Sequence, residues 1–447
     1  MIEKIYLVTD LGPGDGGKGG VVHKLANLFH ADVILKFGGG QGSHGIVTDG
    51  GEKFPFSHWG CGTLEAIPTA IAPSFIAIPH AILNEGQALQ RMGLNNPYAL
   101  LSIDPCTLCA TPFHKIASQL SELYRKDAPR GTVGTGAGEA YRLERKFSGG
   151  LSLRVRDLGN AAKVRQVLEK IISYYQNKFA NLSLAKDFLT ADQDAANELL
   201  DLLHDPRYVE WTLEQYARLM PCGITLRMFD EILQQCSGIA IAECSHGVLT
   251  DAEYGFKPHV SAIRTLPQFP LETLSNAGYT GKVVRLGVTR AYAIRHGAGP
   301  LPTASSELRG RLLPGSHKDT NRWQGEVRVG AVDFKLLRHA INLCGGSTAF
   351  DGICVTCFDQ ILKDNVWEIC DSYTAECPIC NDAICDCLNC KNLLSCIKDE
   401  RINPNITTIH NSQHEMMQKC CEVFYQQLGV PVRLISLGPS DQDKILL

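Results

Sequence analysis

The stretch IYLVTDLGPGDGGKGGVVHKLANL, residues 5–28, decides the fold class of this chain. It opens with an apolar run typical of a buried strand and ends in a segment with the apolar spacing of a helix. Between them, five of the eight residues 12–19 are glycine. The turn has the G-x-x-x-x-G-K spacing of a phosphate-binding loop, with Gly19 where Ser or Thr normally binds Mg²⁺. A strand, a glycine-rich turn and a helix in this order predict a nucleotide phosphate site.

Two charged residues of this loop indicate chemistry. Lys18 supplies a positive charge for phosphate oxygens. Asp15 is unexpected in an anion-binding loop, unless it holds Mg²⁺ or accepts a proton from a substrate. The alternative is a turn aspartate that bonds its own backbone. The glycines expected to turn their N–H groups toward phosphate are Gly14, Gly16, Gly17 and Gly19.

A second glycine-rich turn follows the next strand-like run, residues 32–35. It carries Gln41 and Ser43, and it ends at His44. A lone histidine is usually structural or on the surface. This one is placed at the carboxyl edge of a predicted sheet, where open α/β folds bind ligands, so a catalytic role and a structural role both stay open.

The order of the predicted elements favours an α/β fold. Strand-like runs alternate with helical segments through the first hundred residues and return at 238–243, 352–355 and 431–436. Such alternation predicts a P-loop-like, mostly parallel central sheet covered by helices. The stretch 160–235 is rich in helix formers and predicts a helical subdomain. We therefore expect a single domain over residues 1–447 that carries insertions.

Two local patterns make narrower predictions. Residues 74–78 form a further apolar run of strand length, and we expect them in the same α/β unit. A helix is predicted over about 411–428, and Gly429 is expected to end it, because glycine adopts the left-handed conformation that terminates many helices.

Composition limits the classes of function. Hydrophobic residues make up 44% of the 447 and charged residues 20%, a mixture typical of a globular protein with a large core. The net charge of −4 argues against a general nucleic-acid binder. No apolar run approaches the roughly 20 residues that span a bilayer, and no basic leader precedes the first strand. We expect a cytoplasmic protein without a membrane or nucleic-acid partner.

The cysteines are unevenly distributed, since twelve of the eighteen lie from Cys344 onward. Residues 370–400 form a Cys-rich insertion that contains two C-x₂-C pairs. Paired cysteines of this kind suit tetrahedral structural Zn²⁺, and the alternative is a set of reduced thiols in a surface loop. The candidate zinc ligands are Cys377, Cys380, Cys387 and Cys390.

Taken together, the motifs resemble the adenylosuccinate synthetase family. That family carries G-D-E-G-K-G after its first strand and N-A-G-H-T after its second, where this chain reads GDGGKG and QGSHG. Further blocks follow in family order over nearly the whole chain. The matching blocks are residues 14–19, 41–45, 131–141, 243–251, 257–261, 294–303, 356–359 and 429–439.

The resemblance implies a ligase that joins L-aspartate to C6 of IMP with GTP hydrolysis through a 6-phosphoryl intermediate. Asp15 would take the proton from purine N1, His44 would stabilise charge on the transferring phosphoryl group, and Lys18 would contact phosphate. Mg²⁺ would be held by Asp15 and a backbone carbonyl near Ser43. The resemblance places the GTP base at Asp359, Ser436, Gly438 and Pro439, and the purine monophosphate at Gln41, Thr132, Val133, His246 and Ser261.

The same resemblance implies a homodimer in which an arginine reaches the partner's nucleotide site, here Arg154 or Arg156. The amino-acid substrate would meet Thr320, Arg322 and Arg328.

Several departures from the family pattern bear on substrate choice. The family's arginine-rich T-T-G-R-x-R-R-x-G-W segment reads TNRWQGEVRVG here, from Thr320 to Gly330, with Glu326 added. A different amine, a different purine such as GMP or dGMP, or a weakly active nucleotide-binding regulatory protein therefore stay open as alternatives. The other departures are Gly16, Gly20, Gln41, Gly45, Val133, His246 and Cys357.

Overall fold

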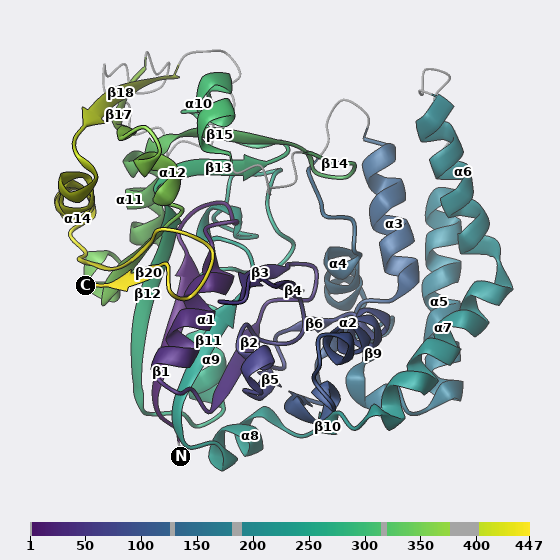
Figure 1. The fold of residues 1–447 in the computed structure, drawn as a ribbon. Helices are drawn as coiled ribbons and strands as arrows, with labels where there is room; N and C mark the ends of the chain where they lie inside the picture. Colours follow the sequence, from purple (N-terminus) through teal and green to yellow (C-terminus); the bar gives the residue numbers. More distant parts are fainter. Residues whose placement is uncertain (1, 126–129, 181–189, 314–319, 376–401) are drawn as a thin grey trace.

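A computed structural model describes residues 2–125, 130–180, 190–313, 320–375 and 402–447. Its centre is a ten-stranded sheet in the order β10-β7-β5-β2-β11-β1-β12-β16-β19-β20 (Figure 1). Every neighbouring pair in it is parallel except β19 with β20. The strands are β1 Ile2–Asp10, β2 Val33–Phe37, β5 Thr69–Ile71, β7 Leu101–Ile103, β10 Thr225–Leu226, β11 Gly238–Cys244, β12 Lys282–Arg290, β16 Gly352–Thr356, β19 Val432–Ser436 and β20 Lys444–Leu446.

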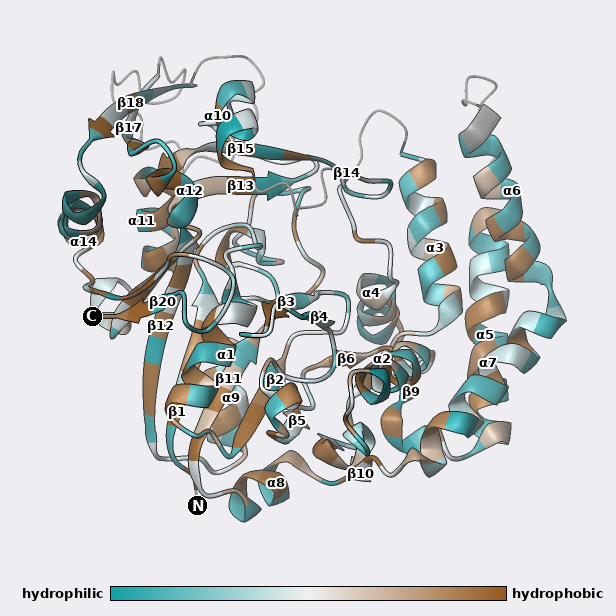
Figure 2. Ribbon diagram, viewed as in Figure 1, coloured by the Kyte–Doolittle hydropathy of each residue, from teal (hydrophilic) through white to brown (hydrophobic). Residues whose placement is uncertain are grey.

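Strand β1 is central because both of its faces are apolar. Ile5 and Leu7 pack into one hydrophobic cluster, while Val8 packs into another on the opposite face. A strand covered on both faces is typical of parallel sheets flanked by helices. Figure 2 shows hydrophobic residues along β1 and β12, between the helices. The predicted α/β fold with a mostly parallel sheet is confirmed.

The helices lie around this sheet in Figure 1, with α5, α6 and α7 together on one side, away from α14. Residues 160–235 contain α5 to α8, with the short strand β10. No helix among the described residues is long and apolar enough to cross a membrane. The helices are α1 Lys18–Leu28, α2 Pro79–Arg91, α3 Pro112–Leu123, α4 Ala137–Phe147, α5 Ala161–Phe179, α6 Thr190–His204, α7 Pro206–Leu219, α8 Phe229–Gln235, α9 Gln268–Asn276, α10 Ser306–Leu312, α11 Phe334–Leu343, α12 Asp359–Leu362 and α14 Gln413–Leu428.

Smaller sheets border the central one. Strands β13, β15, β17 and β18 form one of them, with β14 paired to β15, and β3 and β4 form a hairpin. The run 74–78 contributes only β6, which pairs with β8 outside the central sheet. The bounds are β3 His44–Val47, β4 Lys53–Phe56, β6 Ile76–Ala77, β8 Leu108–Cys109, β9 Leu153–Arg154, β13 Tyr292–His296, β14 Thr320–Asn321, β15 Gly325–Asp333, β17 Val366–Ala375 and β18 Ile402–His410.

The predicted end of the last helix is confirmed. Gly429 has a φ of +68° and follows α14, and its N–H donates to the Tyr425 carbonyl at 2.8 Å. The chain then enters β19, which lies within the last of the matching sequence blocks, residues 429–439.

Candidate active site

A cavity of about 220 Å³ opens beside the loop between β1 and α1. Its walls come from that loop, from the turn after β2, from residues 130–142 and from the ends of β11 and β13. Residues expected from sequence to share one site therefore meet around one space, although they lie up to 247 positions apart. The expected site residues that line it are Gly14, Asp15, Gln41, Thr132, Val133, His246 and Ser261.

A buried carboxylate at the end of β1 holds the backbone of the phosphate loop, which we define as residues 12–19. Asp10 accepts hydrogen bonds from the N–H groups of Gly12 and Gly16, both at 2.8 Å. The Lys18 ammonium lies 2.9 Å from Asp10 Oδ2 and donates to the His246 carbonyl at 2.8 Å. Sequence reasoning missed Asp10, which its position as the last residue of the first strand could have indicated.

The glycines of the loop are required by close neighbours. A Cβ on Gly16 would lie 2.7 Å from Asp10 Oδ2, so Asp10 leaves no room for a side chain at this position. A Cβ on Gly19 would lie 2.7 Å from the Gly45 carbonyl. The absence of the usual Ser or Thr at residue 19 therefore follows from the tight packing of α1 against the turn that carries His44.

Asp15 stands apart from this packed backbone. Its side chain is 46% exposed, and its Oδ2 lies 3.1 Å from His296 Nε2. Its φ is +57°, and the buried Arg290 side chain donates to its carbonyl at 2.6 Å. The backbone is therefore fixed while the carboxylate borders the cavity, a placement that suits a proton acceptor or a ligand for Mg²⁺. Ser43 is exposed and directly precedes His44, the first residue of β3.

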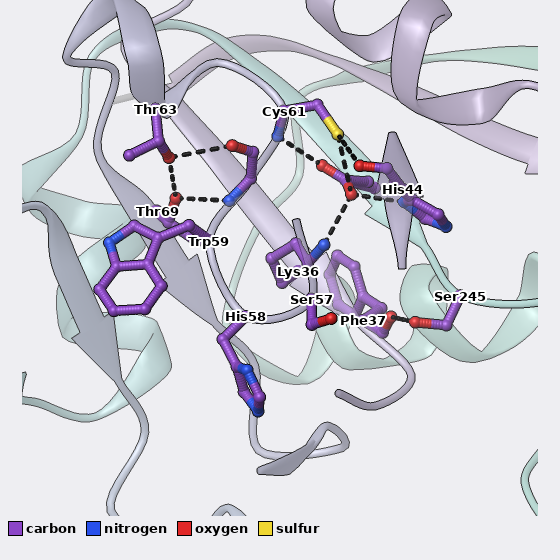
Figure 3. Close-up of polar contacts among 12 residues, drawn as sticks. Lys36, Phe37, His44, Ser57, His58, Trp59, Cys61, Thr63, Thr69 and Ser245 are labelled. Carbon is purple, nitrogen blue, oxygen red and sulfur yellow. Dashed lines mark hydrogen bonds and ion pairs between the residues drawn. The ribbon is translucent and has the colours of Figure 1, made fainter. Parts of the chain in front are cut away.

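His44 is oriented by a buried carboxylate at the end of β11. Its Nδ1 lies 2.5 Å from Glu243 Oε1, which also accepts from the Lys36 ammonium at 2.6 Å. Cys61 donates its backbone N–H to Glu243 Oε2 at 3.0 Å. Figure 3 shows Lys36, His44 and Cys61 converging on this carboxylate. Glu243 belongs to a motif that the sequence already singled out, but its role as the partner of His44 required the structure.

The charges in this cluster have identifiable causes. Burial opposes ionisation of Glu243, yet the Lys36 ammonium and His44 hold its pKa well below the usual range. Burial lowers the pKa of His44, against the opposing effect of Glu243. The free protein thus holds a neutral imidazole bonded to a carboxylate, and added negative charge from phosphates would favour its protonation.

The His44, Cys61 and Glu243 ligand atoms all lie within 4.8 Å of one another, a donor set that suits Zn²⁺. The Lys36 ammonium already bonds the shared carboxylate oxygen at 2.6 Å. Coulomb repulsion opposes a second cation at that position. We therefore assign this cluster to the orientation of His44.

In the lining of the cavity, Gln41 Nε2 lies 2.6 Å from His246 Nε2. Burial, followed by the Lys18 charge, lowers the pKa of His246 to about 4, so this imidazole is neutral near pH 7. The Thr132 hydroxyl accepts from the Gly134 N–H at 3.2 Å, and Ser261 donates its N–H to the Thr250 carbonyl at 2.7 Å. The expected monophosphate contacts are thus fixed in their own loops around the cavity.

The residues expected to bind the GTP base meet at the ends of two neighbouring strands. Asp359 begins α12 just after β16, and Ser436 is the last residue of β19, which pairs with β16. The Phe358 N–H donates to the Ser436 carbonyl at 3.0 Å, and the Ser436 hydroxyl donates to the Gly438 carbonyl at 2.7 Å. Pro439 follows directly in the loop between β19 and β20.

The arginines expected to bind the amino-acid substrate differ in their surroundings. Arg328 on β15 donates through Nη2 to the Gly297 and Gly299 carbonyls, both at 2.6 Å. Arg322 is 55% exposed and lies over the Trp323 ring, 3.9 Å from Asp192. Thr320 lies in β14. The Arg328 guanidinium is thus bonded to backbone carbonyls, whereas the Arg322 guanidinium faces solvent beside Trp323.

The two arginines expected to reach a partner's site are not among the residues that line the cavity. Arg154 donates to the Cys106 carbonyl and to Glu144, and Arg156 is exposed beside the Cys106 thiol. The four candidate zinc ligands, Cys377, Cys380, Cys387 and Cys390, lie outside the described residues. Cys370, at the edge of this insertion, is buried in β17.

A mostly parallel sheet with a glycine-rich loop after its first strand and a polar cavity beside that loop is typical of nucleotide-binding proteins. The family model for adenylosuccinate synthetase matches residues 8–445, and the chain belongs to that family. Members are Mg²⁺-dependent, GTP-binding ligases of purine biosynthesis.

Similar curated proteins are the adenylosuccinate synthetases of Neisseria meningitidis, 25% identical, and Pseudomonas putida, 26% identical; each alignment covers 97% of this chain and 96% of the relative. Fully ligated adenylosuccinate synthetase from Plasmodium falciparum has a similar fold, with a TM-score of 0.73 at 16% identity and 99% coverage of both chains. The cyanophage S-2L succinoaminodeoxyadenylate synthetase, bound to dGMP and dATP, has a TM-score of 0.57 at 13% identity, covering 100% of this chain and 96% of its own.

Proposed function

We propose that this protein joins L-aspartate to C6 of IMP while GTP is converted to GDP and phosphate. The observation that carries the proposal is the position of Asp15, a half-exposed carboxylate on a fixed backbone between the phosphate loop and the cavity. A carboxylate in that position can accept a proton from a purine ring in the cavity and remain in contact with phosphates bound to the loop.

The proposed reaction has two steps. Asp15 accepts the proton of purine N1, O6 attacks the γ-phosphorus of GTP, and the bond to the GDP oxygen breaks. The aspartate amine then attacks C6, and phosphate leaves with the O6 oxygen as the amine loses a proton. Because the uncatalysed leaving group at C6 would be hydroxide, phosphorylation of O6 makes the second step feasible.

The chain's own groups supply the rest. His44, oriented by Glu243, would donate to the charge that develops on the transferring phosphoryl group and its leaving oxygen. The N–H groups of the phosphate loop and the start of α1 would bind phosphate oxygens, with Lys18 beside them. Asp15 and the carbonyl of Ser43 would hold Mg²⁺, which neutralises phosphate charge when bound. Asp359 would accept hydrogen bonds from the guanine base, with Ser436, Gly438 and Pro439 around it.

Phosphate release tests the proposal. Purified protein is incubated with GTP, Mg²⁺ and aspartate, in parallel with IMP, GMP and dGMP. We expect release with IMP that needs aspartate and is lost in Asp15→Asn. Replacement of GTP by ATP in the same assay tests the base preference attributed to Asp359. Release that is independent of aspartate would contradict the assigned amine.

A second purine is favoured by one observation. Gln41 and His246 are paired at 2.6 Å on the cavity wall, where the family has an asparagine and a glutamine. Because its Nε2 accepts from the Gln41 amide, the neutral His246 has only its Nδ1–H left as a donor, whereas an amide side chain offers both a donor and an acceptor. Release with GMP or dGMP but not with IMP would support this alternative. Binding of GTP without turnover of any purine would support a regulatory protein.

A homodimer is part of the proposal. Arg154 and Arg156 lie outside the cavity of their own chain, as a residue that serves a partner's site would. Sedimentation should give a dimer, and Arg154→Leu or Arg156→Leu should raise the KM for the purine monophosphate. A monomeric protein with full activity would contradict this part.

A further inference from the structure

The base loop, residues 437–443 between β19 and β20, is held by the helix that starts at the phosphate loop. Three side chains of α1 bond to Asp441. His23 Nδ1 lies 2.8 Å from Asp441 Oδ1, Asn27 Nδ2 donates to Oδ2 at 2.6 Å, and the Lys24 ammonium donates to the Asp441 carbonyl at 3.0 Å. Side chains of α1 thus bond both carboxylate oxygens and the backbone carbonyl of Asp441.

His23 also joins a third segment. Its Nε2 lies 2.7 Å from Glu65 Oε1, at the end of the short helix η1, Thr63–Glu65, four residues after Cys61. The His23 side chain is only 3% exposed. With a carboxylate at each ring nitrogen, both nitrogens can donate only when the ring is protonated. The buried imidazolium therefore links α1, the base loop and the segment that leads from His44.

These contacts control a distance that matters for a nucleoside triphosphate. One end of α1 is Lys18 in the phosphate loop, and Asp441 lies two residues after Pro439 in the base loop. A triphosphate reaches from one loop to the other, so its affinity depends on their spacing. The base loop is otherwise supported by Lys444, whose ammonium donates to the Pro439 and Ser440 carbonyls at 3.1 and 2.6 Å.

We propose that His23 is a positioning residue for the nucleoside triphosphate, which acts by fixing Asp441 and with it the base loop relative to the phosphate loop. His23 touches neither the phosphates nor the base in this arrangement. The inference rests on the proposed function only in taking GTP as the occupant. Loss of the pair would weaken triphosphate binding and leave the purine monophosphate cavity unchanged, because the described hydrogen-bond partners of His23 are not among the residues that line that cavity.

The charge of His23 makes its contact with Asp441 dependent on pH. Burial opposes protonation, but the hydrogen bonds of Asp441 and Glu65 raise the pKa of His23 to about 9. The other charged groups around Asp441 are Lys24 and Lys444; burial lowers the pKa of Lys444. As pH rises through about 9, His23 loses one N–H and one of its two carboxylate bonds, so the base loop loosens at alkaline pH.

The test measures steady-state KM and kcat for GTP in His23→Gln and Asp441→Asn. We expect the KM for GTP to rise about tenfold, because each variant loses one charge-assisted hydrogen bond. The kcat and the KM for IMP should stay within about twofold of the wild-type values. The wild-type KM for GTP should rise between about pH 8 and 10, and that of His23→Gln should rise less, by the part that Lys444 contributes. His23→Lys, which keeps a cation, should recover part of the loss.

Glu65→Gln is the matched control, because it removes the other carboxylate bonded to the His23 ring but leaves Asp441 bonded. It should change the KM for GTP by less than about twofold.

A second measurement does not depend on turnover. Amide hydrogen exchange of residues 437–443 in the free protein should be faster in His23→Gln and Asp441→Asn than in wild type or Glu65→Gln. Unchanged exchange and an unchanged KM in both variants would overturn the inference, as would an equal effect of Glu65→Gln. If wild-type protein turns over no purine, the proposed function fails, while the exchange experiment still decides the role of His23.

Discussion

The phosphate loop and the 320–330 segment border the same cavity region, yet their charged residues are used in opposite ways. In the phosphate loop, Lys18 is buried and paired with Asp10, while Asp15 is left half-exposed. In the 320–330 segment, Arg328 donates inward to two backbone carbonyls, and Arg322 is exposed beside Trp323.

The difference shows which half of the reaction is preorganised. Groups for phosphoryl transfer are held by buried carboxylates, so little reorganisation is needed when phosphates bind. The two arginines expected to bind a dicarboxylate differ, because Arg328 already bonds two backbone carbonyls while Arg322 is exposed. Variants in the two regions should therefore have different signatures.

The largest effect is expected for Asp15→Asn. Asparagine tolerates the left-handed conformation at φ +57°, so the loop backbone should survive while the proton acceptor is lost. We expect phosphate release with IMP to fall by about 10²–10⁴-fold, as for loss of a general base. An unchanged melting temperature serves as the control. Turnover within about tenfold of wild type would contradict the role of Asp15 as the base.

Glu243→Gln should give the next largest loss. It leaves the Lys36 ammonium buried without its carboxylate and releases His44. Breaking one side of a buried ion pair costs about 3–5 kcal/mol of unfolding free energy, and misplacement of His44 should lower kcat by up to about 10²-fold. Urea unfolding and single-turnover assays measure the two effects.

Cys61→Ser is the matched control for that variant. It keeps the backbone N–H that bonds Glu243 and exchanges one small donor for another. We expect a change in kcat below about threefold and in unfolding free energy near 1 kcal/mol. An effect as large as that of Glu243→Gln would mean that the thiol itself takes part.

In the 320–330 segment, Arg328→Lys and Arg322→Ala separate structure from substrate binding. Lysine cannot reproduce the guanidinium contact with the Gly297 and Gly299 carbonyls, so Arg328→Lys should lower the unfolding free energy by about 1–3 kcal/mol and raise KM for both the purine and the amine. Arg322→Ala should raise only the KM for the amine, by several-fold. A selective amine effect of Arg328→Lys with unchanged stability would instead identify Arg328 as a substrate clamp.

The last prediction concerns the pH dependence of stability on the phosphate-loop side. The pKa of His23 rises from an unfolded value of 6.5 to about 9, so its stabilising contribution is fully present below about pH 6.5 and is lost as pH rises through about 9. Unfolding free energies of wild type and His23→Gln should differ by about 1–3 kcal/mol at pH 6 and converge by pH 10. A gap that is constant with pH would contradict protonation of His23.

Much of this molecule could be predicted from local patterns. The strand, glycine turn and helix of residues 5–28 gave the fold class, because glycine spacing and apolar periodicity report backbone geometry directly. Gly429 was predictable as a helix end for the same reason. The run 74–78 was predicted less well, since only two of its residues pair as a strand, and pairing depends on which neighbour is available.

The sequence by itself determined the α/β class, the phosphate loop and the family resemblance, since these depend on residues close together in the chain. Only the tertiary structure decided that Asp10 holds Lys18, that Glu243 orients His44 and that His23 grips Asp441. Local pattern did not indicate any of these three pairings, and in two of them the partners are about 200 or more positions apart. Charged partners of this kind are selected by packing in three dimensions, and burial then gives their pairing its strength.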